Sequence, residues 1–290
     1  MELDLNKRKK DYPTTEVKKS LTTEDKQMLD RAKALKGCEK QMSGLYKFED
    51  TLSNRNRDTE DPKLPEQALT WIEEGKTMCK KLWIEFPKSQ HPKHIPNAAK
   101  TFALLMASTL DKEKATCIKG FAEQPLPSDW LAGLHSLLYQ LMVHTLKITP
   151  QGNDTFIIED FAIFQLGKQT WRREGAMTIL KAALDTTPEV RYCILSGLDE
   201  IEDGGAGQHC ENLVRMLLSQ FDSRDLPLSF LFVTNGPSEV LTLALEEFKN
   251  KGLEHLVLPP GTEDMFGDHD SGDQSSPVVS LMSRLKDMLG

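Results

Sequence analysis

The feature that most constrains the fold is an alternation of short apolar runs with longer amphipathic segments. The apolar runs have the length of buried strands, and they are Lys81–Phe86, Ala115–Phe121, Tyr192–Leu198, Ser229–Thr234 and His255–Leu258. The segments between them have helical periodicity, and they are Glu66–Lys80, Phe102–Leu110, Trp130–Met142, Phe156–Leu166, Thr170–Leu184 and Glu211–Phe221. Strands that alternate with helices of ten or more residues predict βαβ units. We therefore expect a three-layer α/β fold with a parallel five-stranded sheet.

Composition shifts divide the chain into four parts. Residues 1–20 are polar and are expected to form a disordered terminus. Residues 21–65 are expected to form a helical N-terminal extension, whose helix starts at Thr22 or Thr23, followed by a linker. Residues 66–260 carry the α/β pattern, and residues 261–290 are an acidic tail with a short helix at Pro277–Leu289.

Charge and cysteine usage exclude several functional classes. Residues 195–290 carry 6 Lys+Arg against 17 Asp+Glu, so this third of the chain is unsuited to a nucleic-acid groove, which needs a basic surface. The five cysteines are an odd number without a CxxC pair, which favours a reducing compartment. The first thirty residues contain no apolar signal core, and no stretch approaches 18 apolar residues. These features predict a cytoplasmic protein that binds neither nucleic acid nor membrane.

The run that begins at Tyr192 ends in two adjacent carboxylates, Asp199 and Glu200. Ligands of open α/β sheets bind outside the carboxyl ends of the strands, so these side chains are placed where chemistry would occur. In nucleotide hydrolases such carboxylates hold magnesium or orient the attacking water. A solvated turn is the alternative interpretation of the same two residues.

A strand, a loop and then Lys100-Thr101 at the start of a helix has the layout of a phosphate-binding P-loop. Aligned on GxxxxGK[ST], the two residues match, but His94 and Ala99 replace both glycines. The literal triplet Gly75–Thr77 is a decoy, because it leaves no room for a following helix before the strand at Lys81.

The order of these features resembles the NACHT-type domain of fungal STAND proteins, a branch of the P-loop NTPases. The likeness covers about residues 66–260, and the blocks that carry it are Leu82–Glu85 with Lys100-Thr101, Gly133–Leu141, Cys193–Glu200 and Leu231–Pro237. They resemble the first strand with Walker A, the helix after the second strand, the extended Walker B motif and the sensor strand. The resemblance implies sheet order 5-1-4-3-2. It also implies a nucleotide site at Ala99, Lys100 and Thr101, with Thr101 and Asp199 as magnesium ligands and Asp199 and Glu200 as catalytic carboxylates.

Three departures from the family pattern fall on the same site. Ser196 stands where the family has the Walker B Asp, Gly236 stands where it has the sensor Arg, and His94 and Ala99 replace the P-loop glycines. Loss of such groups slows phosphoryl transfer by orders of magnitude. We therefore expect a degenerate nucleotide-binding module, a pseudoenzyme in signalling, that takes Mg-ATP or Mg-GTP weakly and serves as a regulatory or assembly element.

Two other functions remain open from the sequence. One is a working ATP or GTP switch. The other is a structural scaffold that binds protein partners through its N-terminal helices. Family members continue into a winged helix and a repeat sensor, so the resemblance further implies a fragment, a decayed paralogue or a stand-alone adaptor.

Overall fold

The parallel sheet predicted from the sequence is the centre of the fold. A computed structural model describes residues 27–42, 66–88, 97–122, 132–148, 155–158, 173–202, 206–219, 226–248, 251–260 and 262. The strands of the sheet are β2 (Lys81–Phe86), β3 (Cys117–Phe121), β5 (Tyr192–Ser196), β6 (Ser229–Asn235) and β7 (Leu253–Val257). They lie in the order β3-β5-β6-β2-β7, and all four pairings are parallel. If the five strands are numbered 1 to 5 in chain order, from β2 to β7, the sheet order read from the β7 edge is 5-1-4-3-2. The predicted fold class and strand order are therefore confirmed.

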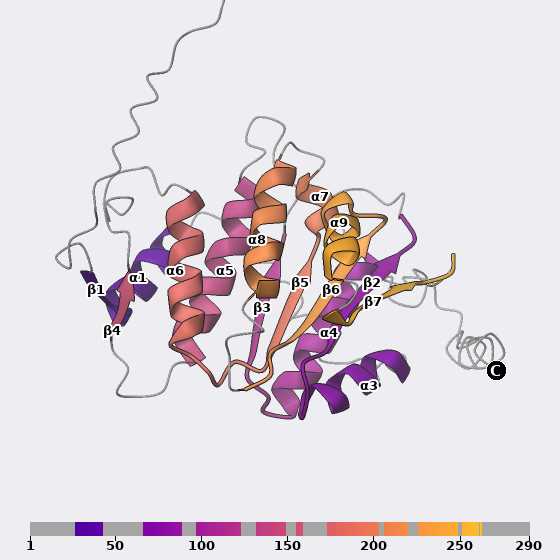
Figure 1. Ribbon diagram of the computed structural model, residues 1–290, viewed down its shortest axis with the longest axis horizontal. Helices are drawn as coiled ribbons and strands as arrows, with labels where there is room; N and C mark the ends of the chain where they lie inside the picture. The colour runs from indigo at the N-terminus through magenta and orange to yellow at the C-terminus, as the bar shows by residue number, and fades with distance from the viewer. Residues whose placement is uncertain are drawn as a thin grey trace, which may run out of the picture.

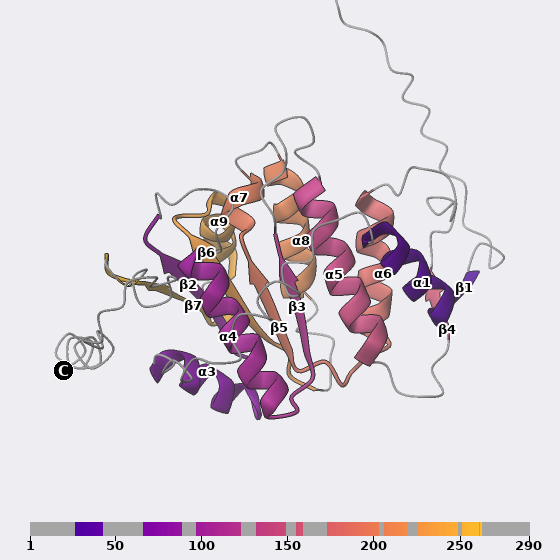
Figure 2. The same ribbon diagram turned by 180° about the vertical axis from the view of Figure 1, so that it is seen from behind.

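Two layers of helices cover the sheet (Figures 1 and 2). On one face lie α3 (Glu66–Gly75) and α4 (Ala98–Lys112), which pack on the side chains of Leu82, Ile84, Ile194 and Leu231. The other face belongs to a second core cluster, which includes Trp83, Cys193, Leu195, Phe230 and Phe232. Its helices are α5 (Ala132–Ile148), α6 (Arg173–Asp185), α8 (Gly207–Ser219) and α9 (Glu239–Phe248). Because side chains of a strand alternate between faces, the two clusters together account for the nearly continuous apolar runs in the sequence.

The edge strand β7 is held to β2 by an aromatic contact as well as by backbone pairing. The imidazole of His255 stacks on the indole of Trp83 with ring centroids 3.7 Å apart, and its Nε2 lies 3.0 Å from Glu85 Oε2. Trp83 is 1% exposed and its Nε1 donates to Thr234 Oγ1. These contacts fix β2, whose carboxyl end leads to the candidate site.

Two segments that were predicted as helical form strands in the described region. The N-terminal helix α1 begins at Arg31 and runs to Met42, and the preceding residues Gln27–Asp30 form strand β1 instead of the start of a helix. Strand β4 (Thr155–Ile158) replaces the start of the helix predicted from Phe156, and it pairs antiparallel with β1. Both errors have one cause: four residues are too few to show a periodicity, and antiparallel pairing with a distant segment decided the backbone conformation.

The helix α1 is packed against the domain. Its buried residues Ala34 and Cys38 belong to the same core cluster as α5, while Lys33, Lys36 and Glu39 are exposed. Glu39 forms an ion pair with Lys147 near the end of α5, at 3.4 Å. The limits of the predicted extension and the tail at 261–290 stay predictions, because most of those residues lie outside the described ranges.

Candidate functional site

Helix α4 begins beside the carboxyl ends of the central strands, and Asn97 caps it. Asn97 has extended backbone angles (φ −71°, ψ 164°), and its side-chain oxygen accepts a hydrogen bond from the Lys100 amide at 2.8 Å. Asn is among the preferred N-cap residues because its side chain satisfies an amide that lacks a partner within the helix. The helix N-terminus that the P-loop comparison assigns to phosphate is therefore partly occupied by the chain's own side chain.

The Lys100 ammonium group pairs with Glu200 across this cap. Lys100 Nζ lies 2.6 Å from Glu200 Oε2, and Asn97 Nδ2 donates to Glu200 Oε1 at 2.9 Å. The Lys100 and Glu200 side chains are only 13% and 15% exposed. Both oxygens of one carboxylate are thus bound by residues at the start of α4. Charge-assisted hydrogen bonds of this kind are roughly twice as strong as neutral ones.

Asp199 lies beside this pair but is directed elsewhere. Its Oδ2 accepts a hydrogen bond from the Asn235 amide at the end of β6, at 3.2 Å, and its Oδ1 is buried without a hydrogen-bond partner among the described residues. Burial, and secondarily the negative charge of Glu200, raise the pKa of Asp199 to about 7. In the described structure, the cost of burying its charge is offset by one hydrogen bond only, from the Asn235 amide.

Ser196 occupies the last position of β5 and is fully buried. It shares its strand face with Tyr192 and Ile194, the face on which α4 packs. Its Oγ has no hydrogen-bond partner among the described residues. The position assigned to the Walker B Asp is therefore inside the protein and on the α4 side, and it carries a neutral hydroxyl.

Two glycines shape the backbone around these side chains. Gly197 follows Ser196 with φ 84°, and a Cβ there would lie 3.0 Å from the carbonyl oxygen of Ala122 and 3.4 Å from Cε of Lys100. Gly236 follows β6 with φ 114°, where a Cβ would meet the side chain of Lys88 at 3.3 Å. L-residues rarely adopt these angles. An Arg at position 236 would therefore be strained if the backbone kept this conformation.

The structure joins some of the predicted site residues and leaves others apart. Lys100 and Glu200 are in direct contact, and Ala99 is buried in the first turn of α4 at 1% exposure. Thr101 lies in the same turn, half-buried, and its amide donates to the Asn97 carbonyl oxygen at 3.0 Å. His94 lies outside the described residues. The decoy Gly75–Thr77 ends α3 instead of opening a helix.

Two residues of the site were missed by the sequence reasoning. Asn97 immediately precedes the helix, and the N-cap preference for Asn would have identified it. Glu202 follows the short helix α7 (Leu198–Ile201), which was predicted as the end of a strand and a loop. Its carboxylate accepts hydrogen bonds from the amides of Glu239 and Val240 at the start of α9, at 3.0 and 3.1 Å. No local sequence signal announced that contact.

The nucleotide and magnesium parts of the predicted ligand fit the described residues unequally. Lys100 and Asn97 already hold a carboxylate, and phosphate oxygens are acceptors of the same kind. Of the residues assigned to magnesium, Thr101 lies half-buried in the first turn of α4, and Asp199 has one oxygen bonded to the Asn235 amide and the other buried without a partner among the described residues. No group of three or more His, Cys, Asp or Glu residues able to hold a metal ion occurs within the described ranges.

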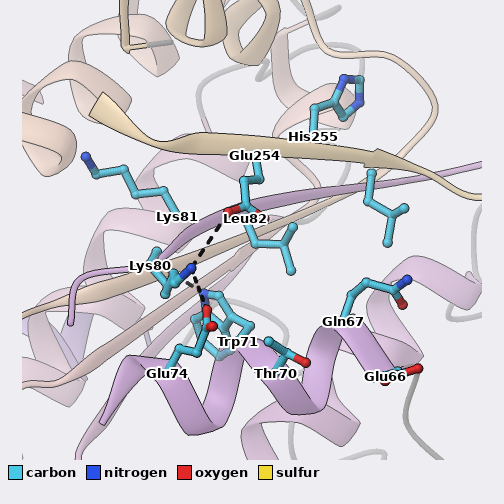
Figure 3. A pocket seen from close by; sticks show the side chains of 11 residues that line it. Glu66, Gln67, Thr70, Trp71, Glu74, Lys80, Lys81, Leu82, Glu254 and His255 are labelled. Carbon is cyan, nitrogen blue, oxygen red and sulfur yellow. Dashed lines mark hydrogen bonds and ion pairs between the residues drawn. The ribbon is translucent and has the colours of Figure 1, made fainter. Parts of the chain in front are cut away.

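A hollow lies at the amino end of the sheet, away from the candidate site (Figure 3). It has a volume of about 510 Å³ and lies between α3 and the edge strand β7, with Leu82 of β2 at its floor. Lys80 crosses it, pairing with Glu74 of α3 and, at 3.8 Å, with Glu254 of β7. Lys80 therefore links α3 to β7 across the groove.

Comparison with known proteins gives distant likenesses in fold alone. No protein-family model matches the chain, and no curated protein matches it in sequence. A solved structure described as the Aeropyrum pernix ORC2 protein in ADPNP and ADP complexes superposes with a TM-score of 0.41 and 15% identity, over 70% of this chain. This chain spans about half of that protein, 50% of its length. At this TM-score the likeness carries no argument about the site. In the part of the chain that the structure describes, no helix is long and apolar enough to cross a membrane.

Proposed function

We propose that this chain is a degenerate nucleotide-binding module of the NACHT type that acts as a regulatory or assembly element and hydrolyses nucleotide weakly or not at all. The observation that carries the proposal is the contact of Lys100 and Asn97 with the Glu200 carboxylate, 2.6 and 2.9 Å long. This contact supports an anion-binding seat, formed by Lys100 and Asn97 at the start of α4. The seat lies at the carboxyl ends of the strands, where ligands of α/β folds bind.

The groups around the Lys100–Glu200 pair are the reason to expect weak hydrolysis. Phosphoryl transfer relies on cations and carboxylates that are positioned before the reaction. Ser196 supplies no charge, Asp199 is tied to the Asn235 amide, and Gly236 offers no side chain to a phosphate. Glu200, the remaining carboxylate, is committed to Lys100.

A regulatory or assembly role is supported by how α1 lies. Its exposed face carries Lys33, Lys36 and Glu39, while Ala34 and Cys38 bind it to the domain. A partner that binds the exposed face of α1 would thus contact an element packed on α5. We propose that protein partners bind this exposed face of α1.

The test is a calorimetric titration of the full chain with ATP and GTP, with and without Mg²⁺, together with a phosphate-release assay. We expect dissociation constants in the high micromolar to millimolar range and turnover below about 1 per second, the low end for typical enzymes. Lys100→Ala should abolish binding, whereas Lys181→Ala, an exposed lysine of α6, should not. Binding that survives Lys100→Ala would contradict the proposal, and rapid turnover would favour the working switch.

A further inference from the structure

The three acidic residues of α7 and its C-cap each hold a different element of the fold. Asp199 accepts from the Asn235 amide at the end of β6, at 3.2 Å. Glu200 is bound by Lys100 and Asn97 of α4. Glu202 accepts from the first amides of α9 and from Ser238 Oγ, at 2.9 Å. A helix of four residues is therefore fixed on three sides by carboxylates.

The attachment to α4 differs chemically from the other two. The contacts of Asp199 and Glu202 are to backbone amides and a hydroxyl, which are ordinary capping donors. The contact of Glu200 is to an ammonium group and a side-chain amide, both donating into one carboxylate. Lysine and amide donors around a terminal oxyanion are also the groups that bind phosphate.

We infer that Glu200 is an internal competitor for phosphate: its carboxylate occupies the seat formed by Lys100 and Asn97, and a polyphosphate binds by displacing it. This inference rests on the proposed function and adds a regulation to the same site. The free protein is held in a self-occupied state by its own carboxylate. An incoming polyphosphate removes the hold of α7 on α4 while the contacts of Asp199 and Glu202 remain.

Energetic reasoning gives the direction of the effect. Displacement of Glu200 requires breaking an ion pair whose partners are 13% and 15% exposed, and this cost is subtracted from the affinity of any phosphate ligand. Glu200→Gln keeps the shape and removes the charge. The substitution removes the negative charge that competes with phosphate for Lys100 and Asn97, and it should therefore increase the affinity of these residues for phosphate.

The experiment is a calorimetric titration of the full chain with inorganic pyrophosphate and, separately, with ADP, both without metal. We expect Glu200→Gln to bind pyrophosphate at least tenfold more tightly than the unchanged protein. Glu246→Gln is the matched control, since Glu246 is an exposed carboxylate of α9, and it should bind as the unchanged protein does. The ADP arm distinguishes a nucleotide site, which gains affinity from the base, from a site for free polyphosphate.

Two further variants keep the result interpretable. Glu200→Asp retains the charge but shortens the side chain by one methylene, and it should also tighten pyrophosphate binding. Adding Lys100→Met to Glu200→Gln should abolish the gain. Equal affinity of the unchanged protein, Glu200→Gln and Glu200→Asp would overturn the competition while leaving nucleotide binding intact. Failure of every variant to bind either ligand would overturn both this inference and the proposed function.

Discussion

The two ends of the central sheet use similar side chains in opposite ways. At the amino end, α3 closes the sheet and its polar groups find partners: Tyr192 Oη donates to the Ile72 carbonyl oxygen at 2.8 Å, and Trp71 Nε1 donates to that of Phe230 at 3.1 Å. Lys81 Nζ likewise donates to the Lys251 carbonyl oxygen at 2.7 Å. These bonds stabilise the amino end, because buried polar groups that are satisfied cost little. Glu189 Oε2, shortly before β5, is the exception here, since it is buried without a partner among the described residues.

At the carboxyl end, satisfaction is incomplete. Ser196 Oγ and Asp199 Oδ1 are buried without a partner among the described residues, and Gly197 has φ 84° beside them. Strained backbone and unsatisfied polar atoms tend to gather at functional sites. The amino end of the sheet thus contributes mainly to stability, whereas the carboxyl end carries the candidate site.

The largest expected effect concerns the amino end. Trp71→Ala should lower the free energy of unfolding by about 3–5 kcal/mol, because the indole is 3% exposed and its removal leaves a cavity and takes a donor from the carbonyl oxygen of Phe230. Urea denaturation at pH 7 measures this. Leu69→Ala, in the same helix but 47% exposed, should cost less than about 1 kcal/mol. Equal losses for the two variants would show that α3 is not the closure described here.

The next effect is a pH dependence at the carboxyl end. The pKa of Asp199 is about 7 in the folded protein, whereas an unperturbed Asp side chain has a pKa of 3.8. The folded protein therefore binds this proton more tightly than the unfolded chain does. The contribution to stability is therefore greatest below about pH 4 and falls as pH rises to about 7, by up to about 4 kcal/mol. The difference between the unchanged protein and Asp199→Asn, measured by urea unfolding from pH 4 to 8, should show this slope. A constant difference would contradict the burial of an isolated carboxyl group.

A third effect compares one ion pair from each end. A double-mutant cycle of Lys100→Met and Glu200→Gln should give a coupling of about 1–3 kcal/mol, because both partners are largely buried. The cycle of Lys80→Met and Glu74→Gln should give less than about 1 kcal/mol, since those side chains are 25% and 41% exposed. Urea unfolding of the unchanged protein and the six variants measures both couplings. A larger coupling at the amino end would reverse the comparison.

The smallest effect concerns backbone conformation. Gly197→Ala places a Cβ 3.0 Å from the Ala122 carbonyl oxygen at φ 84°, whereas Gly252→Ala meets nothing within 4 Å at φ 77°. Both substitutions impose a left-handed conformation on Ala, which costs about 1 kcal/mol. Gly197→Ala should cost about 1 kcal/mol more than Gly252→Ala in thermal or urea unfolding. Equal costs would mean that the turn after β5 relaxes without strain.

How much the sequence could predict follows from the range of the interactions. The strands β2, β3, β5 and β6 were predicted because each is a largely buried apolar run, and Tyr192–Leu198 differs from β5 only by its last two residues. The edge strand β7 is mostly exposed and begins two residues before the predicted His255–Leu258. Gly197 turns the chain and Leu198 begins α7, which apolarity alone does not reveal. The contact of Glu200 with Lys100 joins residues 100 positions apart, so no local pattern could show that they neutralise each other. Asn97 could have been predicted as an N-cap, but its second bond to Glu200 could not.

The measurement that tests the central claim most directly is the melting temperature of the full chain with and without millimolar ATP, ADP and GTP, with and without Mg²⁺. With the dissociation constants proposed above, millimolar nucleotide is at about 1 to 10 times the dissociation constant and adds about 0.4–1.4 kcal/mol of stability. The account predicts a small shift with each nucleotide that depends little on Mg²⁺ and is lost in Lys100→Ala. No shift under any condition would contradict a residual nucleotide seat, and a large shift that requires Mg²⁺ would contradict its degeneracy.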